Sequence, residues 1–503
     1  MDDMSKSIRA VGKNPDKMLI FRNAHFTESG DPTLPTQATS SNTMPPGCTP
    51  SCTPSPRIQS VSLKRDAHLH GLLEITMKRK DHAAAAHPIF VYFEIDVSAS
   101  MDDYEKLNWV QETMVYMIER MVTRATVPVF LCIDAFSTSI DGIVPTTLVT
   151  NDNLAQICDA IWNNMEIRNF TNFERALRHA ADVLTAHRQE YPTHRIMHLF
   201  YTDGNANAGD IFPRTLAALI PDVVGTHHFY IGIGETHNSM ILHQCSQNPR
   251  SEYWFISDPP HIRVVGGEIL HKILYTVASA LRVSLDPHAD AILYDWQSDT
   301  WSHTLSDAHL LDSEMVKRIH IFWSSSDDAD KKLRIRIETD GVSAVDAETS
   351  ALQIDLRPLL TNDIARHVFQ QKVMSLMYRC QQYTQFVLVD AKDDDAGELH
   401  KEQHYDLLRT SLMKLHREIQ MDFGPPSTLM ASLSRDCKSA YKTLGTYDGI
   451  LLLNSRWTAL GIQHVYTPRQ RQRRDESKKR KERPKPPVLE STNASPGRLH
   501  FMS

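Results

Sequence analysis

The sequence predicts an α/β fold, in which a doubly wound, mostly parallel sheet is joined to a small flanking β-rich module and a C-terminal helical region. Three observations predict it. Apolar segments of strand length alternate with helical segments between residues 87 and 282. Short strand-like segments flank this region on both sides, and helical spacing of apolar residues begins near residue 361. With 503 residues, 41% of them hydrophobic, the chain is long enough for several folded parts.

The first strand of the predicted sheet lies in Val91–Ser100, VYFEIDVSAS, whose apolar run ends in Asp96, Ser98 and Ser100. A buried parallel strand is almost continuously apolar, and open α/β sheets bind ligands beyond the carboxyl ends of their strands. Carboxylate and hydroxyl oxygens suit a magnesium-like ion, which usually keeps positions open for water or for an incoming ligand. Taken alone, however, the same residues could simply end the strand and cap the following helix.

Two later segments add oxygen donors at corresponding places. Asn169–Leu177 opens an apolar-periodic helix with Thr171 at its start, and His198–Gly204 is a strand that ends on Asp203. Thr171 could serve as a helix cap or as a metal ligand. Five oxygen donors therefore follow three predicted strand-to-helix loops.

These residues resemble the metal-ion-dependent adhesion site of the von Willebrand factor A family, which is written Asp-x-Ser-x-Ser, then Thr, then Asp. The matching positions are Asp96, Ser98, Ser100, Thr171 and Asp203. One departure is Ala99, where the commonest form of the motif has Gly. The resemblance implies that Mg²⁺ or Mn²⁺ binds here, that the Ser and Thr hydroxyls touch the ion, and that a partner's Asp or Glu carboxylate completes its shell. It also implies a Rossmann-like domain that carries out no chemistry.

The remaining elements of this domain, residues 87–282, follow in the order that a doubly wound sheet requires. We expect a helix over Tyr104–Arg124, a strand over Val127–Ala135, a hairpin around Asp141–Gly142, a helix over Asn151–Asn163, a helix from Pro213, strands over Thr226–Ile233 and Glu252–Ser257, and a helix over Ile262–Leu281.

Strand-like segments flank this domain in residues 57–86, including Leu72–Met77, and in residues 283–360, where KLRIRIET alternates like a half-buried strand. We expect these pieces to pair into one small sandwich built from both sides of the domain. Residues 361–466 are predicted to be helical, and could dock on the domain or form an oligomer. Residues 1–56 are rich in Pro, Ser and Thr and are predicted to be disordered.

Residues 467–503 form a basic tail, predicted to be disordered. Between Thr467 and Pro487 there are ten Lys or Arg and three acidic residues, a net charge of +7 in a chain whose net charge is −7. Such a segment could be a nuclear-import signal, a contact to nucleic acid or an acidic partner, or a solubilising tail.

Several classes of protein are not indicated. No apolar run reaches the length of about 18 to 20 residues that spans a bilayer, and the N-terminal residues lack the apolar block of a signal peptide. We therefore expect an intracellular protein of cytoplasm or nucleus that is not secreted. The sequence has no Gly-rich phosphate loop, no His-Glu-x-x-His motif and no Gly-x-Ser-x-Gly motif. Cys48 and Cys52 have no second Cys or His pair nearby, so a zinc site is not expected there.

The sequence thus predicts a non-enzymatic intracellular scaffold or adaptor that grips an acidic residue of a protein partner through Mg²⁺ (or Mn²⁺). The alternative is a nucleic-acid-associated protein that uses its basic tail while the domain recruits other factors. By analogy alone, a chaperone-like partner of an ATPase motor is a third possibility. Oligomeric state and the partner's identity stay open.

Overall fold

A computed structural model describes residues 57–65, 70–78, 87–220, 223, 225–313, 315–323, 333–339, 342–348, 355–356, 363–389, 395–422 and 428–463. The predictions for residues 1–56, for Cys48 and Cys52, and for the basic tail lie outside these residues.

The central α/β domain is built on a six-stranded sheet with the order β5-β4-β3-β6-β7-β8, parallel except for the edge strand β5. This order confirms the predicted doubly wound, mostly parallel sheet, because the strand order reverses direction at β3. The strands are β3 (Ile89–Asp96), β4 (Val129–Phe136), β5 (Ile140–Leu148), β6 (Arg195–Thr202), β7 (Thr226–Ile233) and β8 (Ser251–Ile256).

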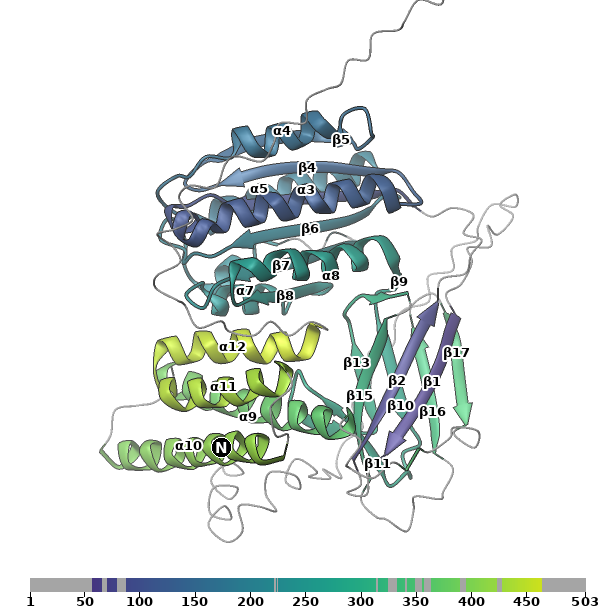
Figure 1. Cartoon of the computed structure of the whole chain (residues 1–503), viewed down its shortest axis with the longest axis vertical. Coiled ribbons are helices and arrows are strands. Elements are labelled where there is room, and N and C mark those ends of the chain that lie inside the picture. Colours follow the sequence, from purple (N-terminus) through teal and green to yellow (C-terminus); the bar gives the residue numbers. More distant parts are fainter. Residues whose placement is uncertain are drawn as a thin grey trace, which may run out of the picture. The chain divides into compact units, whose positions relative to one another are not determined.

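Helices cover both faces of this sheet (Figure 1). Alternate residues of β3 enter different cores: Val91, Phe93 and Ile95 pack with α3, α4 and α8, whereas Phe90 and Tyr92 pack against α5. This explains why β3 has an unbroken apolar sequence, since both of its faces are buried. The helical segments are η2 (Ala99–Glu105), α3 (Lys106–Arg124), α4 (Leu154–Asn164), α5 (Phe173–Glu190), α6 (Pro213–Ala217), α7 (Ser239–Cys245), η3 (Pro259–His261) and α8 (Ile262–Tyr275).

Three local features differ from the sequence prediction. The hairpin turn lies between Phe136 and Ile140, so Asp141–Gly142 belongs to β5 rather than to the turn. The last helix ends at Tyr275, because Thr276 is extended and starts a short strand. Helix α7 was not predicted, since its seven residues are too few to show a helical period.

Strands from both sides of the central domain form two further sheets, ordered β12-β11-β15-β2-β1-β18 and β13-β10-β16-β17. One apolar core contains residues of both sheets, which confirms the predicted sandwich. Strand β2 from before the domain pairs with β15 from after it. The strands are β1 (Arg57–Arg65), β2 (His70–Lys78), β10 (Leu281–Leu285), β11 (Ala291–Asp295), β12 (Thr300–Ser302), β13 (Thr304–Asp307), β15 (Val316–Trp323), β16 (Arg334–Thr339), β17 (Val342–Glu348) and β18 (Asp355–Leu356), with β9 (Thr276–Ala278) paired to β14 (Leu311–Asp312).

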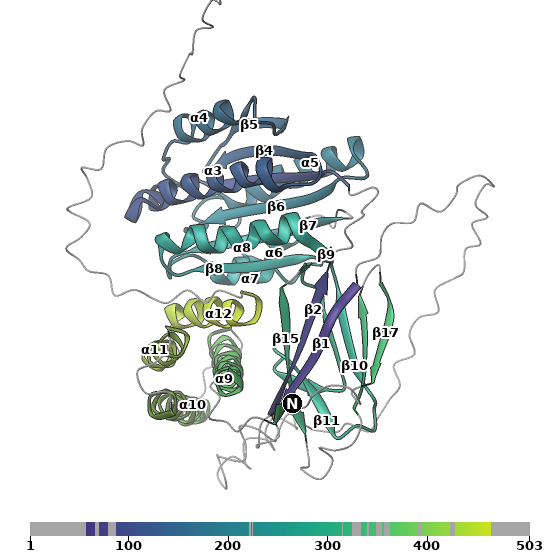
Figure 2. The same ribbon diagram turned by 45° about the vertical axis from the view of Figure 1, so that its right-hand side comes forward.

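The C-terminal region is helical, as predicted, and packs on the central domain (Figure 2). Tyr253 of β8 shares a hydrogen bond of 2.9 Å with Ser455, and Ser239 of α7 donates to the carbonyl of Leu451 at 2.9 Å. No helix among the described residues is long and apolar enough to cross a membrane. The helices are α9 (Asp363–Val389), α10 (Asp395–Asp422), α11 (Thr428–Thr443) and α12 (Tyr447–Ile462).

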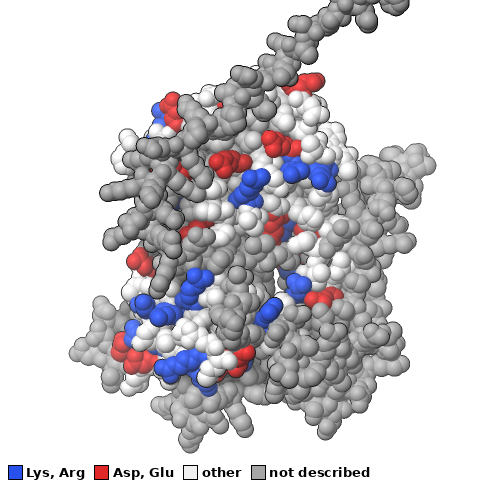
Figure 3. All heavy atoms as spheres, viewed as in Figure 1, with Lys and Arg blue, Asp and Glu red and all other residues white. Residues whose placement is uncertain are grey.

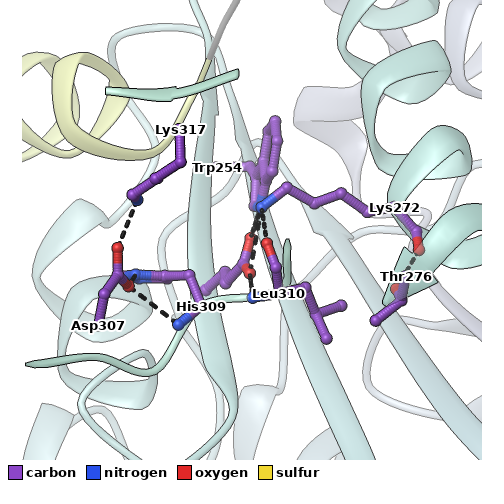
Figure 4. A network of polar contacts seen from close by, with 8 residues as sticks. Trp254, Lys272, Thr276, Asp307, His309, Leu310 and Lys317 are labelled. Carbon is purple, nitrogen blue, oxygen red and sulfur yellow. Dashed lines mark hydrogen bonds and ion pairs between the residues drawn. The ribbon is translucent and has the colours of Figure 1, made fainter. Parts of the chain in front are cut away.

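A buried ion pair within the central domain also holds the segment that follows β13 (Figure 4). Lys272 of α8 donates to Glu252 of β8 at 3.1 Å, and Glu252 also accepts the backbone N–H of Leu310 at 3.0 Å. Burial, the largest influence, raises the pKa of Glu252, but Lys272, His309 and the N–H of Leu310 together outweigh it, so that the pKa is lowered. Both groups are therefore charged in the interior, where each depends on the other.

Candidate metal centre

The structure places all five predicted donors at the carboxyl end of the sheet, on three loops. Asp96 is the last residue of β3, and Ser98 and Ser100 follow it directly; Thr171 precedes α5, and Asp203 follows β6. Ser100 Oγ donates to Asp203 Oδ1 at 2.7 Å and lies 3.2 Å from Ser98 Oγ. These contacts join the first loop to the third.

Gly204 shows how closely the other donors converge. A Cβ atom built on Gly204 would lie 3.1 Å from Thr171 Oγ1, 3.3 Å from Asp96 Oδ2 and 3.6 Å from Ser98 Oγ. Oxygen atoms from the first and second loops therefore surround one small space beside Gly204 of the third loop, and this space is left open because residue 204 has no side chain. The structure brings the five predicted residues together.

The carboxylate of Asp96 is fully buried. Its Oδ1 accepts the backbone N–H of Ser98 at 2.8 Å, and its Oδ2 accepts the hydroxyl of Thr202 at 2.5 Å. Burial raises the pKa of Asp96 to about 7, although these hydrogen bonds act in the opposite direction and the nearby Asp203 adds to the increase. A cation beside Asp96 would supply the compensating charge that the hydrogen bonds do not.

Thr171 is held in place from the third loop and does not cap the helix. Its backbone N–H donates to Asn207 Oδ1 at 2.7 Å, and its carbonyl accepts the N–H of Asn207 at 3.0 Å. The N-cap of α5 is instead Asn172, whose side chain accepts the N–H of Arg175 at 2.9 Å. The sequence left Thr171 two roles, helix cap or metal ligand. The role of the cap belongs to Asn172 instead.

Lys106 is part of the site and was missed in the sequence. It is the first residue of α3, it is buried, and its ammonium group forms an ion pair with Asp203 and donates to the carbonyl of Ser100 at 3.1 Å. A signal was present, because Lys106 stands four residues before Val110 at the head of the buried stripe of α3. A lysine on an apolar stripe indicates a buried partner.

The backbone just before Lys106 is strained. Tyr104 and Glu105 have φ values of 58° and 57°, in the left-handed region that non-glycine residues avoid. Each such residue costs about 1–3 kcal/mol, and such strain clusters at functional sites. The two residues carry the chain from the first donor loop into α3 so that Lys106 reaches Asp203.

The donor set fits a hard divalent cation. It consists of two carboxylates and three hydroxyls, all of them oxygen ligands of the type that Mg²⁺ prefers. These five groups are too few to fill the octahedral shell of the ion. Zinc and other softer metals favour His and Cys, and among the described residues no group of three or more His, Cys, Asp or Glu side chains could hold a metal ion.

No family model and no curated protein sequence matches the chain. Among solved structures it is similar to a von Willebrand factor type A protein from Catenulispora acidiphila, with a TM-score of 0.46 and 13% identity over 78% of this chain and 89% of that one. It is also similar to the ArnB paralog VWA2 from Sulfolobus acidocaldarius, with a TM-score of 0.39 and 14% identity over 79% of this chain and 97% of that one. A third is proximal thread matrix protein 1 from the mussel byssus with a zinc-occupied MIDAS motif, with a TM-score of 0.31 and 16% identity over 37% of this chain and 48% of that one. At these identities and TM-scores the similarity indicates no ligand or partner for this chain.

Proposed function

We propose that the central domain is a divalent-cation-dependent protein-interaction module, which binds an Asp or Glu side chain of a partner through Mg²⁺ or Mn²⁺. The observation that carries this proposal is the convergence of Asp96, Ser98 and Thr171 on the space left open at Gly204, with Ser100 linking Ser98 to Asp203. The hydroxyls of Ser98, Ser100 and Thr171 would contact the ion, and the two carboxylates would balance its charge.

The energetic basis is electrostatic. When bound, the ion would supply a positive charge with an unfilled coordination position, which gains strongly from an anionic oxygen and little from a neutral surface. Of the surrounding residues, Lys106 offsets the charge of Asp203, so the five donors and Lys106 together carry a net charge of −1 when Asp96 is ionised. A divalent ion makes the net charge of the site positive, and an acidic partner residue binds favourably only to a positive site.

Nothing in this arrangement requires a chemical reaction. The polar groups around the donors are themselves engaged: Lys106 pairs with Asp203, Thr202 donates to Asp96, and Asn207 holds the backbone of Thr171. We accordingly propose a non-enzymatic, intracellular scaffold or adaptor. Within it, the site would recruit the partner and the other regions would join it to further components.

As the alternative function, we propose that the basic tail contacts nucleic acid or an acidic partner. On the face drawn in Figure 3, acidic and basic side chains of the described residues are interspersed, whereas nucleic-acid-binding surfaces carry a basic patch or stripe. The net charge of +7 between residues 467 and 487 therefore remains the main support for this role. Its binding would weaken steeply with added salt, unlike a metal-bridged contact.

Asp96→Asn tests the proposal. Asn has the same size, its oxygen can still accept the N–H of Ser98, and its amide can donate to the hydroxyl of Thr202, so the fold should survive. The matched control is Asp134→Asn on the adjacent strand β4, a buried carboxylate that accepts Tyr92 and His179 away from the donor loops.

Mg²⁺ affinity is measured by calorimetry, and partner capture is compared in Mg²⁺ and in EDTA. We expect the wild type and Asp134→Asn to bind Mg²⁺ and to capture partner in an EDTA-sensitive manner, and Asp96→Asn to do neither. Equal Mg²⁺ binding by both variants would show that the site is elsewhere.

A further inference from the structure

Exposed apolar side chains gather on the segments that carry the metal donors. Eleven large hydrophobic residues are exposed among the described residues, and five of them lie on or beside the three donor loops. The five are Tyr104, Ile167, Phe170, Ile211 and Phe212, with exposed fractions between 38% and 68%. We call these five residues the apolar rim.

Hydrogen bonds tie two of the three rim segments to a donor loop or to the start of α5. Phe170 immediately precedes Thr171, and the N–H of Arg168, next to Ile167, donates to the carbonyl of Val97 inside the first donor loop at 2.6 Å. The third loop is fixed against the start of α5, because the N–H of Asp210 donates to Glu174 at 2.9 Å. The rim is therefore positioned together with the site and is not a set of separate surface residues.

The side chains of the rim expose a large apolar area in total. If an aromatic side chain offers about 200 Å² of surface, the three aromatic residues of the rim together expose on the order of 350 Å². Apolar patches of a few hundred Å² on soluble proteins commonly mark interaction sites. Tyr104 is exposed and also has a left-handed backbone conformation, which costs backbone strain.

The charges of the same segments are mostly negative. Around the rim, residues 101–105, 166–170 and 205–212 contain five acidic side chains and a single basic one, Arg168. These acidic side chains would repel an anionic membrane surface, and they would also repel a partner segment with several carboxylates. A partner segment with a single carboxylate for the cation, apolar residues beside it for the apolar rim and basic residues further out for the acidic side chains would complement the whole surface.

We infer that the apolar rim selects its partner: a protein segment with one Asp or Glu, flanked on both sides by large apolar residues and then by Lys or Arg. This inference rests on the proposed function, because it assigns the rim to the partner of the same metal centre. The carboxylate would give the metal dependence, and burial of the apolar flanks would give the specificity.

Three synthetic peptides test the inference by fluorescence anisotropy in Mg²⁺. The first has a central Glu flanked by Leu and Phe and ends in Lys; the second replaces Leu and Phe by Ser; the third replaces the Glu by Gln. We expect the first to bind at least about tenfold more tightly than the second, because even one buried apolar side chain is worth this factor. The third peptide should lose binding, and EDTA should abolish the binding of the first.

The double variant Phe170→Ser with Phe212→Ser removes two rim rings without touching a donor. It should lose the preference for the first peptide over the second while keeping the Mg²⁺ affinity of the wild type. Met421→Ser with Tyr447→Ser is the matched control, because both residues are exposed apolar side chains on the helical region. That variant should behave like the wild type.

The outcomes separate the two proposals. Absence of Mg²⁺ binding by the wild type would contradict the proposed function itself. Mg²⁺ binding with equal affinity for the first two peptides would overturn only the role of the rim. Peptide binding that persists in EDTA would contradict the metal bridge of the proposed function. Sedimentation of the protein with phosphatidylserine vesicles in place of peptide binding would overturn the inference in favour of a membrane surface.

Discussion

Gly204→Ala offers a direct test of the candidate metal centre, because it adds one methyl group to the space between the donors. That methyl carbon would lie 3.1 Å from Thr171 Oγ1 and 3.3 Å from Asp96 Oδ2, so these neighbours must shift by a few tenths of an ångström. Mg²⁺ tolerates such shifts poorly, since it requires near-ideal octahedral geometry with oxygens at about 2.0–2.1 Å. We expect its affinity to fall by about ten- to a hundredfold, which corresponds to about 1.4–2.8 kcal/mol.

The stability of the Gly204→Ala variant should change little. The φ of Gly204 lies outside the left-handed region, so Ala can adopt it, and the loss of chain freedom in the unfolded state offsets the local crowding. Gly267→Ala in α8 is the matched control, because nothing lies within 4 Å of its added methyl group. It should raise the free energy of unfolding by about 0.5–1 kcal/mol and leave Mg²⁺ affinity unchanged.

Calorimetric titration with Mg²⁺ and thermal unfolding in EDTA, carried out on both Gly variants and the wild type, separate the two effects. A Gly204→Ala protein that binds Mg²⁺ as tightly as the wild type would refute the placement of the ion among these donors. Loss of affinity in the Gly267→Ala control would show that the assay reports on folding rather than on the site.

Three further predictions concern the same site. Lys106→Met should raise Mg²⁺ affinity by about tenfold or more, because the ammonium group no longer competes for Asp203, and weaker binding in calorimetry would contradict this. Because burial raises the pKa of Asp96 to about 7 in the metal-free protein, protons should compete with the ion below that pH and lower its apparent affinity by up to about tenfold per pH unit. The same raised pKa makes the contribution of Asp96 to metal-free stability decrease as pH rises from about 4 to 7, and a flat calorimetric pH profile would count against both effects. Thr171→Ala should weaken Mg²⁺ binding with little change in melting temperature, whereas Asn172→Ala should cost about 0.5–2 kcal/mol of stability and spare binding; the opposite pattern would make Thr171 structural.

The donors could be predicted from the sequence because each lies directly after a strand or before a helix that is visible in the local pattern. Asp96 ends an apolar run and Asp203 ends another, and parallel strands bring such ends to one edge of the sheet. The convergence on Gly204 could not be predicted, since it depends on where the third loop crosses the other two. Metal occupancy of these donors stays a prediction.

Lys106 shows why other parts of the site escape sequence analysis. Its position on the buried stripe of α3 indicates that its ammonium group needs a partner, but several carboxylates lie near in sequence and Asp203 is 97 residues away. The choice of partner is fixed only by packing of α3 against the sheet. The end of α8 at Tyr275 is a similar case, because the strand that starts at Thr276 forms only through its pairing with β14.

The contacts behind the donors explain how the site can be ready for a ligand. Asn238, at the start of α7, donates its N–H to the carbonyl of Gly204 at 3.1 Å, and its neighbour Ser239 donates to Leu451 of α12. On the opposite side, Asn207 fixes Thr171 and Lys106 fixes Asp203. Each donor loop is thus held by protein groups before an ion or partner arrives. Since the entropy of ordering these loops has already been lost on folding, more of the interaction energy at the site is left for binding.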